Sequence, residues 1–432
     1  MRRTSLTKPR VTLLALSFLL ATAVPGASQT PFHKVFVFGH DVKGSNSVTA
    51  ITAAAPYLPG WGFGFEGEPP SVEASSIGGA PFFFSFDAPE GNYKITATLG
   101  ADEPSETTVK AELRRLMVET AAASAGGSIT KTFIVNVRTP ALPTGGVIRL
   151  KAPRESEQEA RDWDSRITLE FNGTHPSVRS LTVDRVDVPT IYLLGDSTVC
   201  DQMGEPWASW GQMLPRFFKA TVAVANHAES GESVSSSIAR SRFDRILSLI
   251  KPGDVFIVQF GHNDMKEKAK DPDAAQKYKA GLIDWANAIK AKGATPVIVT
   301  PMNRHTFQDG HVINSLEEYP QMAREAAAET GAALIDLNAQ SKILYEAFGE
   351  AGSLHLFEHN ADYTQMDGTH HSPFGAYELA KLIIQGLIDD KLPIAQQVIA
   401  DWKTFDPTHP DAEADFHVPP SVTYAAAKPL GN

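Results

Sequence analysis

The sequence predicts a three-layer α/β/α fold with a five-stranded parallel sheet, preceded by an all-β sandwich domain. The chain has 432 residues, which exceeds what a single hydrophobic core usually supports and favours two domains. Up to about residue 186, apolar residues alternate with polar ones, as in strands that are buried on one face. From residue 190 onward, short apolar runs alternate with helical patterns, which is typical of a parallel sheet built from βα repeats.

The N-terminal segment predicts an export signal that is removed from the mature protein. Four cations precede an apolar run of 14 residues at 11–24, and small residues follow this run. The run is short for a membrane span, which needs about 20 apolar residues, and it suits a secretory signal peptide. We therefore expect cleavage of residues 1–27 and an exported protein, either periplasmic or extracellular.

Residues 31–186 predict the sandwich domain, which we expect to be of the jelly-roll or galactose-binding type. Runs at 93–99, 132–137 and 166–171 place alternate apolar side chains on one face of each expected strand. In the first of these runs the side chains are Tyr93, Ile95, Ala97 and Leu99. Clusters of Gly, Pro and Asn between the runs supply the turns that an antiparallel sandwich requires.

Residues 188–400 predict the α/β/α domain. Its expected strands are the apolar runs at 190–195, 221–226, 254–260, 295–300 and 332–337. Apolar residues spaced three and four apart at 243–250 and 282–289 predict amphipathic helices between the strands. Right-handed crossovers then make the sheet parallel. Residues 401–432 are Pro-rich and aperiodic, so we expect an extended C-terminal tail.

The charge of the chain excludes several classes of partner. The net charge is −11, and it falls to −15 without the signal, which carries four cations and no anion. Nucleic acids and anionic membrane surfaces attract basic faces, so we expect neither as a partner. No run after the signal is long enough for membrane insertion. An acidic polysaccharide would need local cations at its binding site, and the oligomeric state stays open.

The residues that follow the apolar runs are the candidates for chemistry. In an open parallel sheet, ligands bind beyond the carboxyl ends of the strands. Ser197 follows the first run and Gly231 follows the second, while Asn263 follows the third. Asp367 and His370 come late in the chain, just before a helix that a serine can cap and a proline can open.

These five residues together predict hydrolysis of an ester through an acyl-serine intermediate. Ser197, which we expect to end a strand and start a helix, would attack, with His370 as general base and Asp367 orienting the imidazole. The backbone N–H groups of Ser197 and Gly231 and the amide of Asn263 would bind the oxyanion. The structural alternatives are a helix cap for Ser197, a turn for Gly231 and a brace for Asn263.

Four short blocks in this half of the chain resemble those of the SGNH (GDSL-type) hydrolases. The blocks are Gly-Asp-Ser at 195–197, Ser-Gly-Glu-Ser at 230–233, Gly-His-Asn-Asp at 261–264 and Asp-Gly-Thr-His at 367–370. The resemblance covers residues 190 to about 392. It implies a flavodoxin-like three-layer fold and a metal-free mechanism. It also implies the same catalytic and oxyanion-hole roles, so we expect no cofactor.

A narrower resemblance is to the rhamnogalacturonan acetylesterases. It rests on "GDSTV", "FGHND" and "DGTHHSP", and on the segments 206–218 and 300–307. This resemblance implies a secreted carbohydrate esterase that removes O-acetyl groups from pectin. Relatives often carry arginine where this chain has Glu232, a difference that bears on substrate recognition. The alternatives are another acetylated glycan such as xylan, a lipid or thioester, or a carbohydrate-binding protein whose hydrolase domain is inactive.

Four further residues are candidates for contact with the substrate. Arg304 could pair with a uronate carboxylate, and a solvated surface arginine is the alternative. Trp207 and Trp210 could stack on sugar rings or lie in the core. His371 competes with His370 for the role of base, and the Asp-x-x-His spacing selects His370, which leaves His371 to pack or to touch the substrate.

Overall fold

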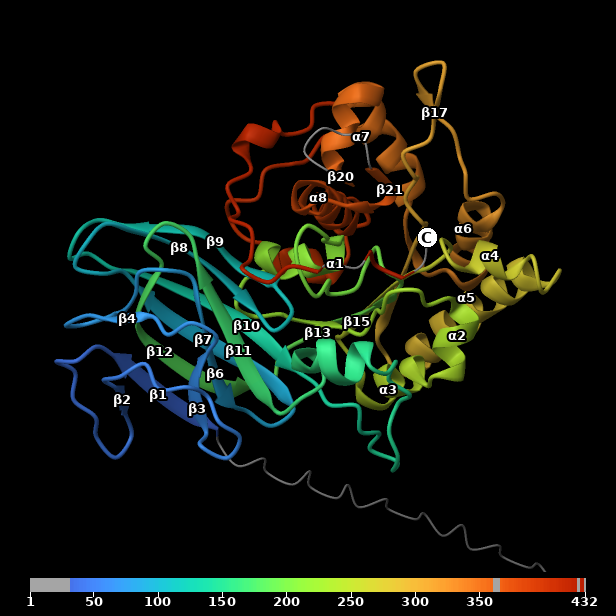
Figure 1. Cartoon of the computed structure of the whole chain (residues 1–432). Helices are drawn as coiled ribbons and strands as arrows, with labels where there is room; N and C mark the ends of the chain where they lie inside the picture. Colours follow the sequence, from blue (N-terminus) through green and yellow to red (C-terminus); the bar gives the residue numbers. More distant parts are fainter. Residues whose placement is uncertain (1–31, 360–365, 426–427, 431–432) are drawn as a thin grey trace, which may run out of the picture. The chain divides into compact units, whose positions relative to one another are not determined.

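The computed structural model describes residues 32–359, 366–425 and 428–430, and residues from Phe32 onward form one compact unit (Figure 1). The signal peptide expected at 1–27 lies outside the described residues. Across the described ranges, no helix combines the length and the apolar character needed to cross a membrane. Because the unit is continuous, the division into an N-terminal domain, a second domain and a tail stays a prediction.

Two β-sheets, mostly antiparallel, form the N-terminal half. The first sheet has the order β10 (Ile129–Val137), β7 (Gly91–Leu99), β12 (Ser177–Val186), β1 (His33–Phe38) and β2 (Thr49–Ile51), with β5 (Ile77–Gly78) beside β12 and β4 (Ser71–Val72) beside β5. The second has the order β3 (Phe63–Glu66), β6 (Phe82–Asp87), β11 (Arg166–Asn172), β8 (Ser105–Ala111) and β9 (Arg115–Ala123).

The core between these sheets follows from the alternation in the sequence. On β7 the side chains of Tyr93, Ile95, Ala97 and Leu99 are fully buried, and their polar neighbours are partly exposed. The alternate residues of β11 enter the same core, where phenylalanines from several strands pack edge to face. The all-β sandwich predicted from the period of two is therefore confirmed.

The second half contains the five-stranded parallel sheet that the apolar runs predict. Its order is β14 (Ala223–Asn226), β13 (Thr190–Gly195), β15 (Val255–Gln259), β16 (Thr295–Val299) and β19 (Ala333–Ile335), and every pairing is parallel. The principal helices are α1 (Trp210–Met213), α2 (Val234–Ala239), α3 (Arg242–Leu249), α4 (Asp264–Glu267), α5 (Ala274–Ala291), α6 (Tyr319–Thr330), α7 (Leu337–Gly352) and α8 (Pro373–Asp389).

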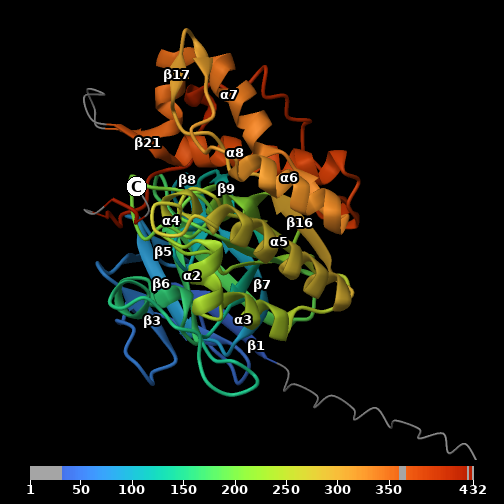
Figure 2. The same ribbon diagram turned by 90° about the vertical axis from the view of Figure 1, so that its right-hand side faces the viewer.

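Helices cover both faces of this sheet, which explains why its strands are continuous apolar runs. Ile191 and Leu193 of β13 pack in one core with α1, α7 and α8. Tyr192 and Leu194 point to the other face, into a core with α3, α5 and α6. Figure 1 shows α1, α7 and α8 on one side of β13 and β15 and α3 on the other, and α7 and α8 again lie far from α3 in Figure 2. The three-layer architecture is therefore as predicted.

Short elements complete the chain. They are the helical turns η1 (Arg154–Gln158), η2 (Ala160–Asp162), η3 (Leu214–Phe217), η4 (Ser353–Leu356), η5 (Pro393–Gln397) and η6 (Glu413–Asp415), and the strand pairs β17 (Phe307–Gln308) with β18 (His311–Val312) and β20 (Phe357–His359) with β21 (Met366–His371).

Buried charges join the sandwich to the half that contains the parallel sheet. Arg115 of β9 lies between Asp162, at 2.9 Å, and Asp201, at 2.8 Å, and its side chain is 1% exposed. Asp201 also accepts a hydrogen bond from Asn226 at the end of β14. Because Asp201 follows the Ser197 loop closely, the sandwich is tied to the segment that carries the candidate nucleophile.

Candidate active site

Ser197 lies in a tight turn directly after β13. A side-chain oxygen of Asp196 accepts hydrogen bonds from the N–H of Thr198, at 2.9 Å, and from its hydroxyl, at 2.7 Å, which holds the turn closed. A Cβ on Gly195 would come within 2.6 Å of the Gln259 carbonyl oxygen, so only glycine allows this close approach. The expectation that Ser197 starts a helix is wrong, because the Asp196 turn satisfies the local backbone and the next helix begins at Trp210.

Asp367 and His370 lie on β21, just before α8. Ser372 caps that helix by accepting from Gly375 N–H, and Pro373 is its first residue, as the sequence predicts. His370 Nδ1 is 2.7 Å from Asp367 Oδ2, and His370 Nε2 is 2.8 Å from Ser197 Oγ. When Nδ1 carries the proton, it donates to the carboxylate and Nε2 accepts the serine hydroxyl.

The carboxylate of Asp367 is held in its charged form. Burial alone would raise its pKa, but the hydrogen bond and charge of His370 outweigh burial. The N–H groups of Thr369, at 2.9 Å, and of His370, at 3.1 Å, also donate to this carboxylate. The pKa of Asp367 therefore lies well below its ordinary value, so the carboxylate is an anion that can stabilise an imidazolium at any physiological pH.

Three hydrogen-bond donors are the candidates for binding an oxyanion formed at Ser197. Among the hydrogen bonds of the described residues, the backbone N–H groups of Ser197 and Gly231 donate to no partner. Gly231 has a φ of +72°, a conformation that favours glycine. Asn263 is 8% exposed, and its Nδ2 donates one hydrogen bond to the Glu232 carbonyl at 2.9 Å, which leaves the second N–H of that amide. N–H groups that have no partner in the protein are available to an oxyanion.

His371 and Trp210 do not reach this site. His371 Nε2 is 2.9 Å from the hydroxyl of Tyr345, its ring packs on Phe357, and burial lowers the pKa of His371 to about 3. Trp210 is fully buried and donates to Gln259 Oε1, so it belongs to the core and cannot stack on a sugar. Trp207 is 8% exposed and meets the ring of His370 edge to face at 5.9 Å.

Arg304 braces the loops of the site. Its Nε donates to Thr369 Oγ1 at 3.0 Å, and its Nη2 donates to the His262 carbonyl at 3.3 Å. Thr369 precedes His370 and His262 precedes Asn263, so this guanidinium connects the segments that carry the base and an oxyanion donor. A contact between Arg304 and a substrate carboxylate stays a prediction.

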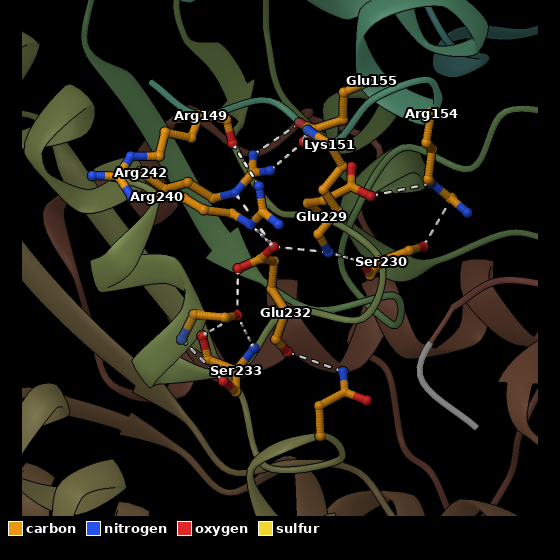
Figure 3. A network of polar contacts seen from close by, with 12 residues as sticks. Arg149, Lys151, Arg154, Glu155, Glu229, Ser230, Glu232, Ser233, Arg240 and Arg242 are labelled. Atoms are coloured by element: carbon orange, nitrogen blue, oxygen red, sulfur yellow. Dashed lines mark hydrogen bonds and ion pairs between the residues drawn. The ribbon is translucent and has the colours of Figure 1, made fainter. Parts of the chain in front are cut away.

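Several functional neighbours were missed by sequence reasoning. Lys428 Nζ is 3.2 Å from Asp367 Oδ2, with the lysine side chain 50% exposed. Lys266 Nζ is 3.5 Å from Asn263 Oδ1. Glu232 is fully buried and pairs with Lys151, while the neighbouring Glu229 pairs with Arg154; both cations come from the N-terminal half (Figure 3). No motif marks Lys151 or Lys428, because the fold brings them to these contacts from distant parts of the chain.

The described residues offer no cluster of three or more His, Cys, Asp or Glu side chains that could hold a metal ion. The printed contacts of the site join Ser197 Oγ to an imidazole, and the imidazole to a carboxylate. This set suits the attack of a hydroxyl on an ester and the binding of the resulting oxyanion.

Comparisons with known proteins agree with this geometry. The GDSL-like Lipase/Acylhydrolase family matches residues 193–375. Rhamnogalacturonan acetylesterase RhgT of Bacillus subtilis (strain 168) is 37% identical over 220 residues, which cover 49% of this chain and 94% of that protein. The uncharacterized esterase YxiM of the same organism is 30% identical over 310 residues, covering 70% of this chain and 73% of that protein.

The crystal structure of YxiM is similar over 84% of this chain and 99% of the YxiM chain, with 25% identity and a TM-score of 0.47. The family match and the relatives define the protein as a carboxylic ester hydrolase with the SGNH-hydrolase fold. The chain belongs to the GDSL-like lipase/acylhydrolase family, so the resemblance drawn from the four sequence blocks is confirmed.

Proposed function

We propose that this protein removes O-acetyl groups from pectic polysaccharide, with acetylated rhamnogalacturonan as the substrate. One observation carries the proposal: a continuous hydrogen-bond chain runs from Asp367 through His370 to Ser197 Oγ. The backbone N–H groups of Ser197 and Gly231 have no partner among the described residues and are available to an oxyanion. This combination provides a nucleophile, a base and an oxyanion site at one point.

In the acylation step, Ser197 Oγ attacks the acetyl carbonyl carbon while His370 Nε2 takes the hydroxyl proton. The carbonyl oxygen becomes an oxyanion and accepts hydrogen bonds from the N–H groups of Ser197 and Gly231 and from the Asn263 amide. Asp367 stabilises the imidazolium without itself taking a proton. The tetrahedral intermediate then breaks its bond to the sugar oxygen, which leaves with the proton from His370.

The second step releases acetate. A water molecule gives a proton to His370 and attacks the acetyl-serine carbonyl, and the same donors bind the new oxyanion. Collapse of this intermediate returns the proton to Ser197 Oγ and frees acetic acid, which ionises in solution. The same residues therefore serve both steps, and in each step His370 first acts as a base and then as an acid.

Two lines of support favour an acidic polysaccharide. The relative RhgT is named as a rhamnogalacturonan acetylesterase and shares 37% identity over the hydrolase half. The net charge of −11 would repel an acidic polymer unless cations were present at the site. Lys266 and Lys428 place ammonium groups beside Asn263 and Asp367, so the site carries local positive charge within an acidic protein.

We also propose that the protein is exported, because its first residues have the three-part pattern of a secretory signal. A polymeric pectin substrate is encountered outside the cytoplasm. Cell fractionation with an antibody against the mature chain tests this proposal. Retention of the full-length protein in the cytoplasm would refute it.

The decisive experiment measures acetate release from acetylated rhamnogalacturonan, acetylated homogalacturonan and acetylated xylan. The wild-type protein is compared with Ser197→Ala and with Ser248→Ala, a matched substitution on α3 that removes only a local hydrogen bond to the Arg245 carbonyl. We expect release from rhamnogalacturonan by the wild type and by Ser248→Ala, and none by Ser197→Ala. Preferential release from xylan would refute the substrate, and unchanged activity of Ser197→Ala would refute the mechanism.

A further inference from the structure

The segment Glu229–Ser233, here called the oxyanion loop, is held by a buried network of charges (Figure 3). Glu232 is fully buried, and three cations lie around one of its carboxylate oxygens. The distances to that oxygen are 2.7 Å from Lys151 Nζ, 3.1 Å from Arg240 Nε and 3.9 Å from Arg242 Nε. A buried carboxylate needs such partners, since an uncompensated charge would be costly to bury.

Lys151 does more than neutralise Glu232. Its ammonium also donates a hydrogen bond to the backbone carbonyl of Ser230, and its side chain is 14% exposed. The same ammonium lies 3.7 Å from the position that a Cβ on Gly231 would occupy. Lys151 therefore binds the backbone of the oxyanion loop at the residue next to Gly231.

The Ser230 carbonyl and the Gly231 N–H belong to one peptide unit. A trans peptide is planar, so its C=O and N–H bonds lie in one plane and point in opposite directions. A hydrogen bond that fixes the direction of the Ser230 carbonyl therefore also fixes the direction of the Gly231 N–H. A cation on the carbonyl oxygen also polarises the peptide, which strengthens the N–H as a donor.

The loop is held on its other side by different contacts. Arg154 Nη2 donates to Ser230 Oγ at 3.0 Å, and Asn263 Nδ2 donates to the Glu232 carbonyl at 2.9 Å. These bonds restrain the flanks of the loop, but neither touches the peptide unit that carries the Gly231 N–H. Among the contacts of the described residues, Lys151 alone binds the Ser230 carbonyl.

We propose that Lys151 is a positioning residue of the oxyanion hole, which aims the Gly231 N–H at the developing oxyanion. This inference rests on the ester hydrolysis proposed above. Lys151 lies between β10 and β11 of the sandwich half and outside the stretch 193–375 that matches the hydrolase family. The N-terminal half therefore completes the active site, in addition to packing against it.

The first test is steady-state hydrolysis of p-nitrophenyl acetate by Lys151→Met and Lys151→Arg. Misplacing a catalytic donor by about 1 Å can cost about 100-fold in rate. We expect kcat of Lys151→Met to fall by roughly 10- to 100-fold with KM changed less than about threefold. Arginine can donate to both the carbonyl and Glu232, so Lys151→Arg should recover most of the rate. The matched control is Arg149→Ala, because the exposed Arg149 contacts Arg240 through its backbone only.

A second variant separates positioning from charge balance. Lys151→Met leaves Glu232 short of a cation, and the double variant Lys151→Met with Glu232→Gln removes both charges. If Lys151 acts through the Ser230 carbonyl, the double variant recovers its melting temperature but keeps the low kcat. Recovery of kcat along with stability would overturn the proposal and assign Lys151 to charge balance. Loss of p-nitrophenyl acetate hydrolysis in the wild type would instead refute the proposed function itself.

Discussion

Replacement of Asn263 by alanine should separate catalysis from folding, because this side chain contributes to both. One N–H of its amide donates to the buried Glu232 carbonyl at 2.9 Å, and the second is available to an oxyanion. Loss of one oxyanion donor costs about 2.7–4 kcal/mol of transition-state stabilisation, so kcat should fall by roughly 10²- to 10³-fold. The carbonyl left without its partner should cost a further ~1–3 kcal/mol of folding stability.

The assay is steady-state hydrolysis of p-nitrophenyl acetate at 25 °C, with urea unfolding of the same samples. Asn172→Ala is the control, because the amide of this buried sandwich residue also donates to a backbone carbonyl, that of Pro420, at 2.7 Å. We expect a similar loss of stability in both variants and a loss of kcat in Asn263→Ala alone. A fall in kcat of less than about tenfold for Asn263→Ala would show that its amide does not bind the oxyanion.

Three further predictions follow from the same structure. Asp367→Asn should keep the fold and lower kcat by roughly 10⁴-fold, since an amide cannot stabilise the imidazolium; a fall below tenfold in the p-nitrophenyl acetate assay would contradict the triad. Burial lowers the pKa of His371 to about 3, so below about pH 6.5 the unfolded chain binds a proton that the folded chain does not. The free energy of unfolding should therefore be highest above about pH 6.5 and decline toward pH 3, by up to about 1.4 kcal/mol per pH unit. Urea unfolding at pH 7, 5 and 4 should show that the free energy of unfolding falls less steeply with decreasing pH in His371→Gln than in the wild type. Equal falls in the two proteins would refute His371 as the cause. Lys110 donates to the Pro419 carbonyl at 2.7 Å and to Ser421 Oγ at 2.8 Å. Lys110→Met should cost about 1–3 kcal/mol and speed proteolytic release of the segment after residue 416, whereas an unchanged cleavage rate would show that Lys110 does not anchor this segment.

Local patterns predicted several elements of the fold. The alternation at Tyr93, Ile95 and Leu99 placed one face of β7 in the core, because a strand has a period of two and its sheet is covered on that face. The continuous run at 190–195 likewise indicated a strand covered on both faces. The start of a helix at Ser197 was wrong, since the side chain of Asp196 closes a turn that competes with the helix.

The site could be predicted where its residues follow strand ends. Ser197, Gly231 and Asn263 were predicted to share one site because the carboxyl ends of parallel strands share one edge. Trp210 could not be placed, because tryptophan suits both a sugar-binding surface and a core, and only packing decides between them. The contacts of Lys151 and Lys428 could not be predicted from the sequence, since they join segments that are far apart in the chain.

The proposed catalytic residues and the cations near them come from different parts of the chain, and this bears on specificity. The proposed nucleophile, base, carboxylate and oxyanion donors all lie within 193–375, the stretch shared with the hydrolase family. The cations Lys151 and Lys428 lie on either side of that stretch, one in the sandwich half and one near the C-terminus. A change in these outer segments can alter the charge around the site while the ester chemistry stays intact. Substrate preference in this protein should therefore depend on segments outside the catalytic half, and exchange of these segments should change the choice of polysaccharide more than the hydrolysis of p-nitrophenyl acetate.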